Sequence, residues 1–180
     1  PVGPITLLDQ VGLDIAAHVT ETSRRIVANR PGFEICEAVV KMAAAGRLGK
    51  KNKKGFYQYD AKGKRQGIDA SAYQFFRGDG KTALPIEDIQ NRALMLMLNE
   101  AVLCLEEGII ANPRDGDLGA VFGIGFLPFT GGPFRAMDSW GIDAVVNTMQ
   151  SLQKKYGERF APAKMLERLA ERGERFHQQG

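Results

Sequence analysis

The chain has 180 residues, of which 44% are hydrophobic and 25% charged, an ordinary composition for a soluble protein that buries a core in one or two domains. No stretch is long and apolar enough to predict a membrane span, and no signal peptide is visible. The net charge of +3 is uneven, because residues 47–65 carry +7 and the remainder carries −4. Cys36 and Cys104 fall in apolar helical patterns, so we expect buried free thiols, which fits a reducing cytoplasm.

The chain opens on a pattern that returns near its end, in residues 3–14 and again in 131–143. The identities recur at a constant offset of 129 and are Gly3/Gly132, Pro4/Pro133, Asp9/Asp138, Gly12/Gly141 and Asp14/Asp143. Self-similarity at a fixed offset indicates a duplicated unit. In each copy, Gly-Pro predicts the start of a short helix, the second Gly its end, and the last Asp the cap of the next helix.

The first copy continues with two predicted helices, at 13–29 and at 34–45. Ile15, Val19 and Ile26 lie on one face of the first of these helices. The basic loop, residues 47–65, follows, and its aromatic residues at 55–59 predict a short extended segment.

Residues 60–84 are rich in Gly, Lys and Asp. This composition predicts a connection between the two copies, with one possible short helix at 69–76.

The second copy begins with the longest predicted helix, at 86–107. It is apolar on all sides around Leu94–Leu98, so we expect it to be central and wrapped by the others. Further helices are predicted at 113–122, near 143–156 and near 162–172. The fold class is therefore all-α, with a first copy at 1–59, a linker at 60–84 and a second copy at 85–180.

The first copy has only Pro1 and Val2 before its elbow, whereas the second has a long helical region before its own. We therefore expect a fragment whose first copy lacks its front end. We expect residues 1–59 to pack on the second copy. We also expect Leu7, Leu8 or Val11 of this elbow to remain exposed or to meet a neighbouring chain.

The residues alone do not identify a catalytic, cofactor-binding or metal-binding group. The glycines from Gly123 to Gly132 follow a helix rather than a strand and are interrupted by prolines, so a structural loop is favoured over a phosphate cradle. His18 and His177 lack a metal-ligand spacing. Asp9 and Asp138 recur, and a structural role, as cap or brace of the elbow, is favoured.

Two motifs of the first copy, residues 3–14 and 46–57, resemble the C-terminal domain of L-3-hydroxyacyl-CoA dehydrogenases. The second copy, with Asn91-Arg92, residues 99–101, 123–126 and 131–134, is similar to the repeated version of that domain in multifunctional β-oxidation enzymes. Residues 114–126 look closest to the α subunit of the bacterial fatty acid oxidation complex of the anaerobic type.

The resemblance implies a parent with an enoyl-CoA hydratase domain, an NAD-binding Rossmann domain and two helical C-terminal domains. In that family a His–Glu pair removes the hydroxyl proton while hydride passes to NAD, and these groups would lie upstream of Pro1. The implied partners are the upstream domains of the same chain, a thiolase (β) subunit and the acyl-CoA substrate. The duplicated copy would take the place of a partner subunit. We expect this chain alone to bind no NAD and no metal, and to be inactive.

The resemblance also indicates roles for two residues of the second copy. Asn91 matches a substrate-positioning Asn of the family by motif, but in the copy that faces away from the NAD domain, so a structural role is expected. Phe122 falls where some relatives place a substrate-contacting Tyr and is the one candidate substrate-binding residue.

Two other functions remain open on the sequence. One is a stand-alone helical protein-interaction module. The other is nucleic-acid binding through 47–65, although this loop contains no recognition helix, and a solvated loop or contact with CoA phosphates is favoured.

Overall fold

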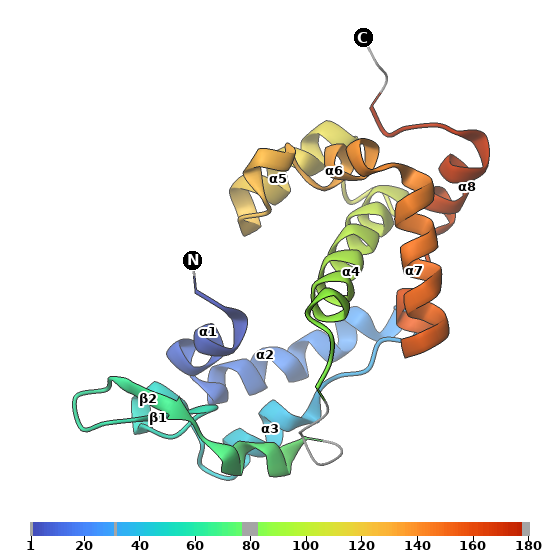
Figure 1. The fold of residues 1–180 in the computed structure, drawn as a ribbon. Coiled ribbons are helices and arrows are strands. Elements are labelled where there is room, and N and C mark those ends of the chain that lie inside the picture. The colour runs from blue at the N-terminus through green and yellow to red at the C-terminus, as the bar shows by residue number, and fades with distance from the viewer. Residues whose placement is uncertain (1, 31, 77–82, 178–180) are drawn as a thin grey trace. The chain divides into compact units, whose positions relative to one another are not determined.

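A computed structural model describes residues 2–30, 32–76 and 83–177, which divide into unit 1, Pro1–Ala83, and unit 2, Leu84–Gly180 (Figure 1). Each unit has its own apolar cluster. Unit 1 consists, in order, of α1 (Pro4–Val11), α2 (Leu13–Ile26), η1 (Val27–Asn29), α3 (Glu37–Ala44), η2 (Lys50–Asn52), β1 (Tyr57–Tyr59), β2 (Arg65–Ile68) and η3 (Ala70–Phe75). The strands form an antiparallel hairpin with an irregular register between Gln58 and Tyr59.

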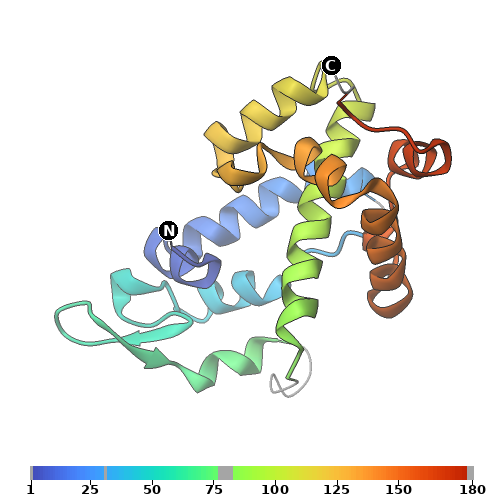
Figure 2. The same cartoon turned by 45° about the horizontal axis from the view of Figure 1, so that its top comes forward.

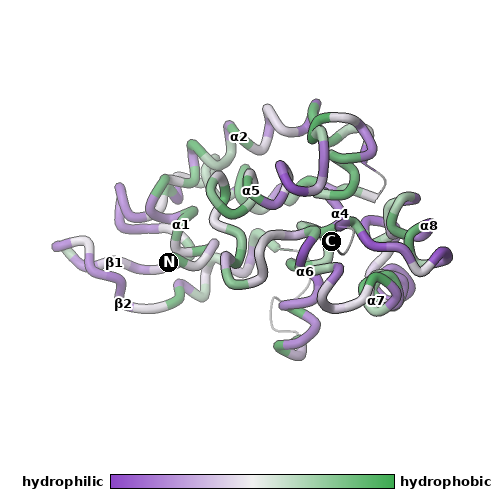
Figure 3. The backbone as a smooth tube through the Cα atoms, turned by 90° about the horizontal axis from the view of Figure 1, so that it is seen from above, coloured by the Kyte–Doolittle hydropathy of each residue, from purple (hydrophilic) through white to green (hydrophobic). Residues whose placement is uncertain are grey.

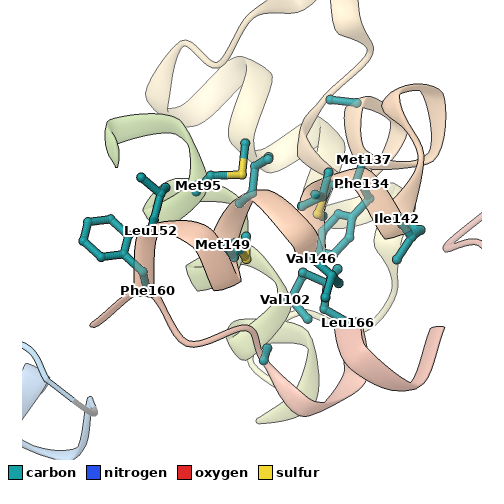
Figure 4. Packing of buried hydrophobic residues seen from close by; sticks show 14 of the residues in the cluster. Met95, Val102, Phe134, Met137, Ile142, Val146, Met149, Leu152, Phe160 and Leu166 are labelled. Carbon is teal, nitrogen blue, oxygen red and sulfur yellow. The ribbon is translucent and has the colours of Figure 1, made fainter. Parts of the chain in front are cut away.

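Unit 2 is built around one long helix. Its elements are α4 (Ile86–Glu106), α5 (Pro113–Ile124), η4 (Pro128–Thr130), α6 (Pro133–Trp140), α7 (Ile142–Tyr156), η5 (Glu158–Phe160) and α8 (Lys164–Arg172). Figure 2 shows α6 and α7 lying against α4. Their apolar faces meet in one cluster that includes Val102, Phe134, Met137, Met149 and Leu166 (Figure 4).

The duplication predicted from the sequence is present as two matching helical elbows. α1 and α6 each span eight residues, and each is joined to the next helix by a single glycine. That glycine has φ 110° and ψ 133° at Gly12, and φ 92° and ψ 123° at Gly141. Residues other than glycine rarely adopt this conformation, because their Cβ atom clashes with the backbone. This explains why glycine recurs there. The prediction of an all-α, duplicated fold is confirmed. β1 lies within the extended segment predicted at 55–59, whereas its partner β2 was not predicted.

The predicted caps at Asp14 and Asp143 are wrong. The helices begin at Leu13 and Ile142, two residues earlier than such caps predict. The glycines are their N-caps, and no side chain accepts a hydrogen bond at either cap. Both aspartates lie instead in the first turn, where a negative charge is favourable near the positive end of the helix dipole. Asp14 also accepts hydrogen bonds from Lys51 Nζ at 2.6 and 2.8 Å.

The recurring elbow aspartate has the same backbone partners in both units. In unit 1 the fully buried Asp9 accepts hydrogen bonds from Phe56 N at 2.9 Å, Tyr57 N at 3.0 Å and the Tyr59 hydroxyl at 2.9 Å. In unit 2 the half-buried Asp138 accepts from Phe176 N at 2.8 Å and His177 N at 2.9 Å. Each carboxylate thus fastens the segment after the third helix of its copy to the elbow. The structural role favoured for both aspartates agrees with this geometry.

Close packing around Asp9 explains two further glycines. A Cβ on Gly49 would collide with the backbone oxygen of Asp9, and one on Gly55 would collide with its carboxylate. Burial raises the pKa of the Tyr59 hydroxyl well above its usual value, and the hydrogen bond to the Asp9 carboxylate adds to this increase. Tyr59 therefore stays protonated and remains a donor to Asp9.

Residues 60–84, predicted to connect the two copies, contain folded elements where they are described. β2 and η3 belong to unit 1, and Ala72, Phe75 and Phe76 pack in its apolar cluster. A buried ion pair fixes this segment: Arg47, 2% exposed, donates to Asp69 Oδ2 at 2.7 Å and to the carbonyl oxygen of Gly55 at 2.6 Å. The polar composition of residues 60–84 did not reveal that their described part is folded. Residues 77–82 lie outside the described part of the chain.

Several predicted elements differ in extent or burial. The helix predicted at 34–45 begins only at Glu37, because the backbone of Cys36 is still extended. Cys36 is exposed and Cys104 half-buried, so the prediction of two buried thiols is wrong. Pro31, expected to stop the first helix, lies outside the described residues.

Two expectations about helix faces are also settled by burial. α4 is not covered on all sides, since Ile89 and Met97 are about half exposed. The apolar face of α2 formed by Ile15, Val19 and Ile26 is likewise exposed.

The exposed elbow expected in the first copy is confirmed. Leu7 and Val11 are 49% and 50% exposed, while Leu8 is half-buried. The positions of unit 2 that match Leu7 and Leu8 are Ala136 and Met137, both fully buried. α4 and α5 pack on α6, whereas no helix in the described part of unit 1 packs on α1 as α4 packs on α6.

We predict that Asp9→Asn destabilises unit 1 by about 2 kcal/mol. The NH₂ group of the asparagine would face one of the buried donors that now bind the carboxylate, and that donor would lose its acceptor. Tyr59→Phe removes only one neutral partner and should cost about 1 kcal/mol or less. Urea unfolding, monitored through hydrogen exchange of the unit 1 amides, measures the loss of stability in both variants. Equal losses in the two variants would contradict a central role for the carboxylate.

The Arg47–Asp69 pair predicts a specific acid sensitivity. Burial raises the pKa of Asp69, but hydrogen bonds from Ser71 and Arg47 outweigh it and hold the pKa below its usual value. The resulting stability is present above the unfolded-state pKa of about 3.9 and is lost as the pH falls through the lower folded-state pKa.

We therefore predict that the free energy of unfolding falls less steeply below about pH 4 in Asp69→Asn than in the parent chain, with Ser71→Ala intermediate. Urea titrations between acid and neutral pH measure the slopes. Parallel pH profiles for all three proteins would show that the Arg47–Asp69 pair does not determine how the free energy of unfolding falls at low pH.

Candidate functional site

No metal site is formed by the described residues, because no three or more of their His, Cys, Asp and Glu side chains gather to hold an ion. Within the same residues no helix has the length and apolar character needed to cross a membrane. Besides the exposed apolar faces of α1 and α2, groups of the described residues that could contact another molecule lie in three places: the basic loop, the end of unit 2 around Asp117, and the outer face of α5.

The basic loop is an ordered turn between α3 and β1. Gly49 and Lys54 exchange two backbone hydrogen bonds of 3.0 Å, which close the turn around η2. Lys53 has φ 65°, a left-handed conformation that is uncommon for a residue other than glycine. Lys51 bonds to Asp14 and ties the loop to the first turn of α2.

The loop also meets the turn of the β1–β2 hairpin. The Cε atom of Lys50 lies 3.4 Å from where a Cβ on Gly63 would stand. Asp60 closes the hairpin turn by accepting hydrogen bonds from the backbone N–H groups of Lys62 and Lys64, each at 2.9 Å. Figure 3 shows both strands and their turn mostly in the purple of hydrophilic residues.

The loop has no counterpart in unit 2. In both units the third helix is followed by a left-handed glycine, Gly46 or Gly173, and then by the residue that binds the elbow aspartate. That residue is Phe56 in unit 1 and Phe176 in unit 2, so the spacer after Gly46 is the longer one. The segment between Gly46 and Phe56 is therefore longer in unit 1 than its counterpart in unit 2.

The Asp117 side chain, only 3% exposed, holds the start of α6 in unit 2. Its Oδ1 atom accepts a 2.8 Å hydrogen bond from Phe134 N, and its Oδ2 atom lies 2.8 Å from His177 Nε2. A Cβ on Gly132 would collide with this aspartate. His177 thus joins two carboxylates, one through its backbone and one through its ring. The sequence showed no sign of this contact, because 60 residues separate the pair.

Phe122, the predicted substrate-contacting residue, lies on the outer face of α5 and is 84% exposed. Other exposed apolar side chains of the same helix and the loop after it are Leu118, Ile124, Leu127 and Phe129. A Cβ on Gly119 or Gly123 would meet nothing within 4 Å, so this face is open.

The asparagines of α4 lie in a structural setting. Asn91 is half-buried, and the guanidinium of the next residue, Arg92, lies 4.5 Å from the ring centre of Tyr156. The buried Asn99 donates to Ala161 O at 2.9 Å and accepts from Ala163 N at 2.8 Å, which fixes the start of α8. The sequence singled out the Asn99 motif only as a family likeness.

Comparison with solved structures shows the fold. The chain is similar to 3-hydroxybutyryl-CoA dehydrogenase from Escherichia coli, with a TM-score of 0.65 and 20% identity over 93% of this chain and 51% of that one. It is also similar to the dehydrogenase part of multifunctional enzyme 1 from C. elegans, with a TM-score of 0.57 and 23% identity over 92% of this chain and 38% of that one.

Curated relatives are similar in sequence along nearly the whole chain. The fatty acid oxidation complex subunit alpha of Idiomarina loihiensis is 48% identical over 178 residues, and that of Shewanella loihica is 49% identical over 179 residues. Each alignment covers 99% of this chain and 25% of the relative, so the chain spans about a quarter of their length.

The family described as "3-hydroxyacyl-CoA dehydrogenase, C-terminal domain" matches residues 1–59 and 89–180. These two matched segments contain the two elbows and the elbow aspartates that bind backbone N–H groups. The chain belongs to the family of 3-hydroxyacyl-CoA dehydrogenase C-terminal domains.

Proposed function

We propose that this chain is the C-terminal helical part of a multifunctional β-oxidation enzyme that acts as an enoyl-CoA hydratase and an NAD-dependent L-3-hydroxyacyl-CoA dehydrogenase. The observation that carries the proposal is 48% identity to a fatty acid oxidation complex subunit alpha across 99% of this chain. Catalysis and NAD binding belong, on this proposal, to upstream Rossmann and hydratase domains of the same parent.

The role proposed for the chain is to support the acyl-CoA cleft and to pack against neighbouring domains. The repeated units are 1–59 and 85–180, with 60–84 between them. The exposed apolar side chains of α1 and α5, such as Leu7, Val11 and Phe122, supply faces that suit packing against another surface. Phe122 would contact an apolar surface in the parent, either acyl chain or protein, because it lacks the hydroxyl of a tyrosine.

The relatives are named as the alpha subunit of a complex, which supports a further subunit for the parent. We take that subunit to be the thiolase (β) subunit, and the compartment to be the cytoplasm. The same exposed faces also suit a stand-alone protein-interaction module, which is the second candidate.

We predict that the purified chain does not reduce NAD in the presence of an L-3-hydroxyacyl-CoA, because the proposed base and the NAD site lie on other domains. Absorbance of NADH measures this directly. The longer gene product that contains the chain should show the activity, and the same product ended before Pro1 should lose stability or activity. NADH formation by the clean chain alone would overturn the proposal.

We predict that Phe122→Ser changes the free energy of unfolding of unit 2 by no more than about 0.5 kcal/mol, because its ring is exposed. Phe134→Ala, which empties a fully buried site, should cost about 3–5 kcal/mol. In the parent, Phe122→Ser should weaken acyl-CoA turnover or domain packing while the fold persists. A parent unaffected in both would remove Phe122 from any contact role.

A further inference from the structure

Five lysines crowd one end of unit 1. Lys50, Lys53, Lys54, Lys62 and Lys64 are all exposed, and within the described part of the chain none of them has an ion-pair partner. Lys51 is different, because it is paired with Asp14. The five free charges therefore form a surface of one sign, which we name the lysine cluster.

The backbone brings the two halves of the lysine cluster together. Lys50 lies against Gly63 in the hairpin turn, between Lys62 and Lys64 in sequence. The carbonyl oxygen of Lys53 accepts a hydrogen bond from Tyr59 N at 3.3 Å, which joins the loop to the start of the hairpin. The cluster is thus fixed by main-chain contacts and is not a set of lysines on a loose tail.

The nearby carboxylates balance only part of the cluster's charge, because Asp60 is the one acidic residue among residues 47–65. Asp9 is buried under Phe56 and Tyr57, and Asp14 is bound to Lys51. Asp60 accepts backbone N–H groups and the side-chain amide of Gln66 at 2.9 Å. Like charges held close together repel one another and destabilise a fold, so an anion bound here would be stabilised by several cations at once.

We propose that the lysine cluster binds the phosphate groups of coenzyme A thioesters. The choice of this ligand rests on the proposed function. Coenzyme A carries a pyrophosphate and a 3′-phosphate, and lysines bind phosphate as mobile point charges. Lys50, Lys53 and Lys54 lie between Gly46 and Phe56, and Lys62 and Lys64 lie in the hairpin turn. The corresponding short segment of unit 2 has no lysine between Gly173 and Phe176. Unit 1 therefore presents a cationic surface that the matching segment of unit 2 lacks.

A single-stranded nucleic acid fits this surface less well. Such binding uses free aromatic faces on which bases stack. The ring of Tyr57 carries the Arg65 guanidinium 4.8 Å from its centre, and the Tyr59 hydroxyl is bound to Asp9. Short, clustered phosphates match the observed groups without needing a stacking platform.

The test uses the intact chain and isothermal titration with free coenzyme A, dephospho-coenzyme A and inorganic phosphate at low salt. The triple variant Lys50→Gln, Lys54→Gln, Lys62→Gln should weaken coenzyme A binding by about tenfold. The control Lys41→Gln, Lys154→Gln, Lys164→Gln removes the same charge from exposed positions elsewhere and should change binding by less than about twofold. Circular dichroism confirms that each variant is folded, and Lys→Arg at the three cluster positions should keep the affinity.

Dephospho-coenzyme A should bind more weakly than coenzyme A, and added salt should weaken both. No binding of coenzyme A, equal losses in the cluster and control variants, or equal affinity for inorganic phosphate would overturn the proposal. Tighter binding of duplex or single-stranded DNA than of coenzyme A would also overturn the proposal and would indicate a nucleic-acid site instead. The titration uses neither NAD nor an upstream domain, so its failure is distinct from a failure of the proposed dehydrogenase function.

Discussion

The fold of each unit depends on one carboxylate that accepts two consecutive backbone N–H groups. Asp9 and Asp138 stand near the ends of α1 and α6, and each binds the segment that follows the third helix of its copy. A carboxylate suits this position because it only accepts hydrogen bonds and has lone pairs for both donors. A buried N–H without a partner is unfavourable, so the aspartate and the two amides stabilise one another. This geometry gives the physical reason why the aspartate recurs in the sequence.

The elbows could be predicted from the sequence, whereas the partners of their aspartates could not. Gly12 and Gly141 reveal the turns because only glycine readily adopts their backbone angles. Helical periodicity likewise predicts α7 and α8 closely. The contact from Asp9 to Phe56 spans 47 residues, and no local pattern specifies such a pairing. The same holds for His177 with Asp117 and for Arg47 with Asp69.

Periodicity also predicts which residues share a helix face, but not what covers that face. Ile15 and Val19 do share a face of α2, yet it is exposed, whereas the buried side of α7 carries Val145 and Met149. The positions of α2 that match these two are Ala16 and Thr20, which are smaller and only half-buried. A core needs a second element to fill it, and in unit 2 that element is α4. Phe122 shows the same limit, because family likeness located the residue while its exposure depends on the surroundings of α5.

The two copies therefore share a scaffold and differ in what they bury and present. Unit 2 encloses Phe134 and Met137 beneath α4 and α5 and fastens its last described segment to Asp138. Unit 1 keeps the matching elbow half exposed and extends the segment after α3 into a cationic loop. The carboxylate bonds are the same in both units although the loop of unit 1 is longer, because Gly49 and Gly55 leave room for that loop to pass directly over Asp9. The hydrogen bonds from Phe56 N and Tyr57 N to Asp9, which fix the fold of unit 1, thus also hold in place the segments that carry the lysine cluster.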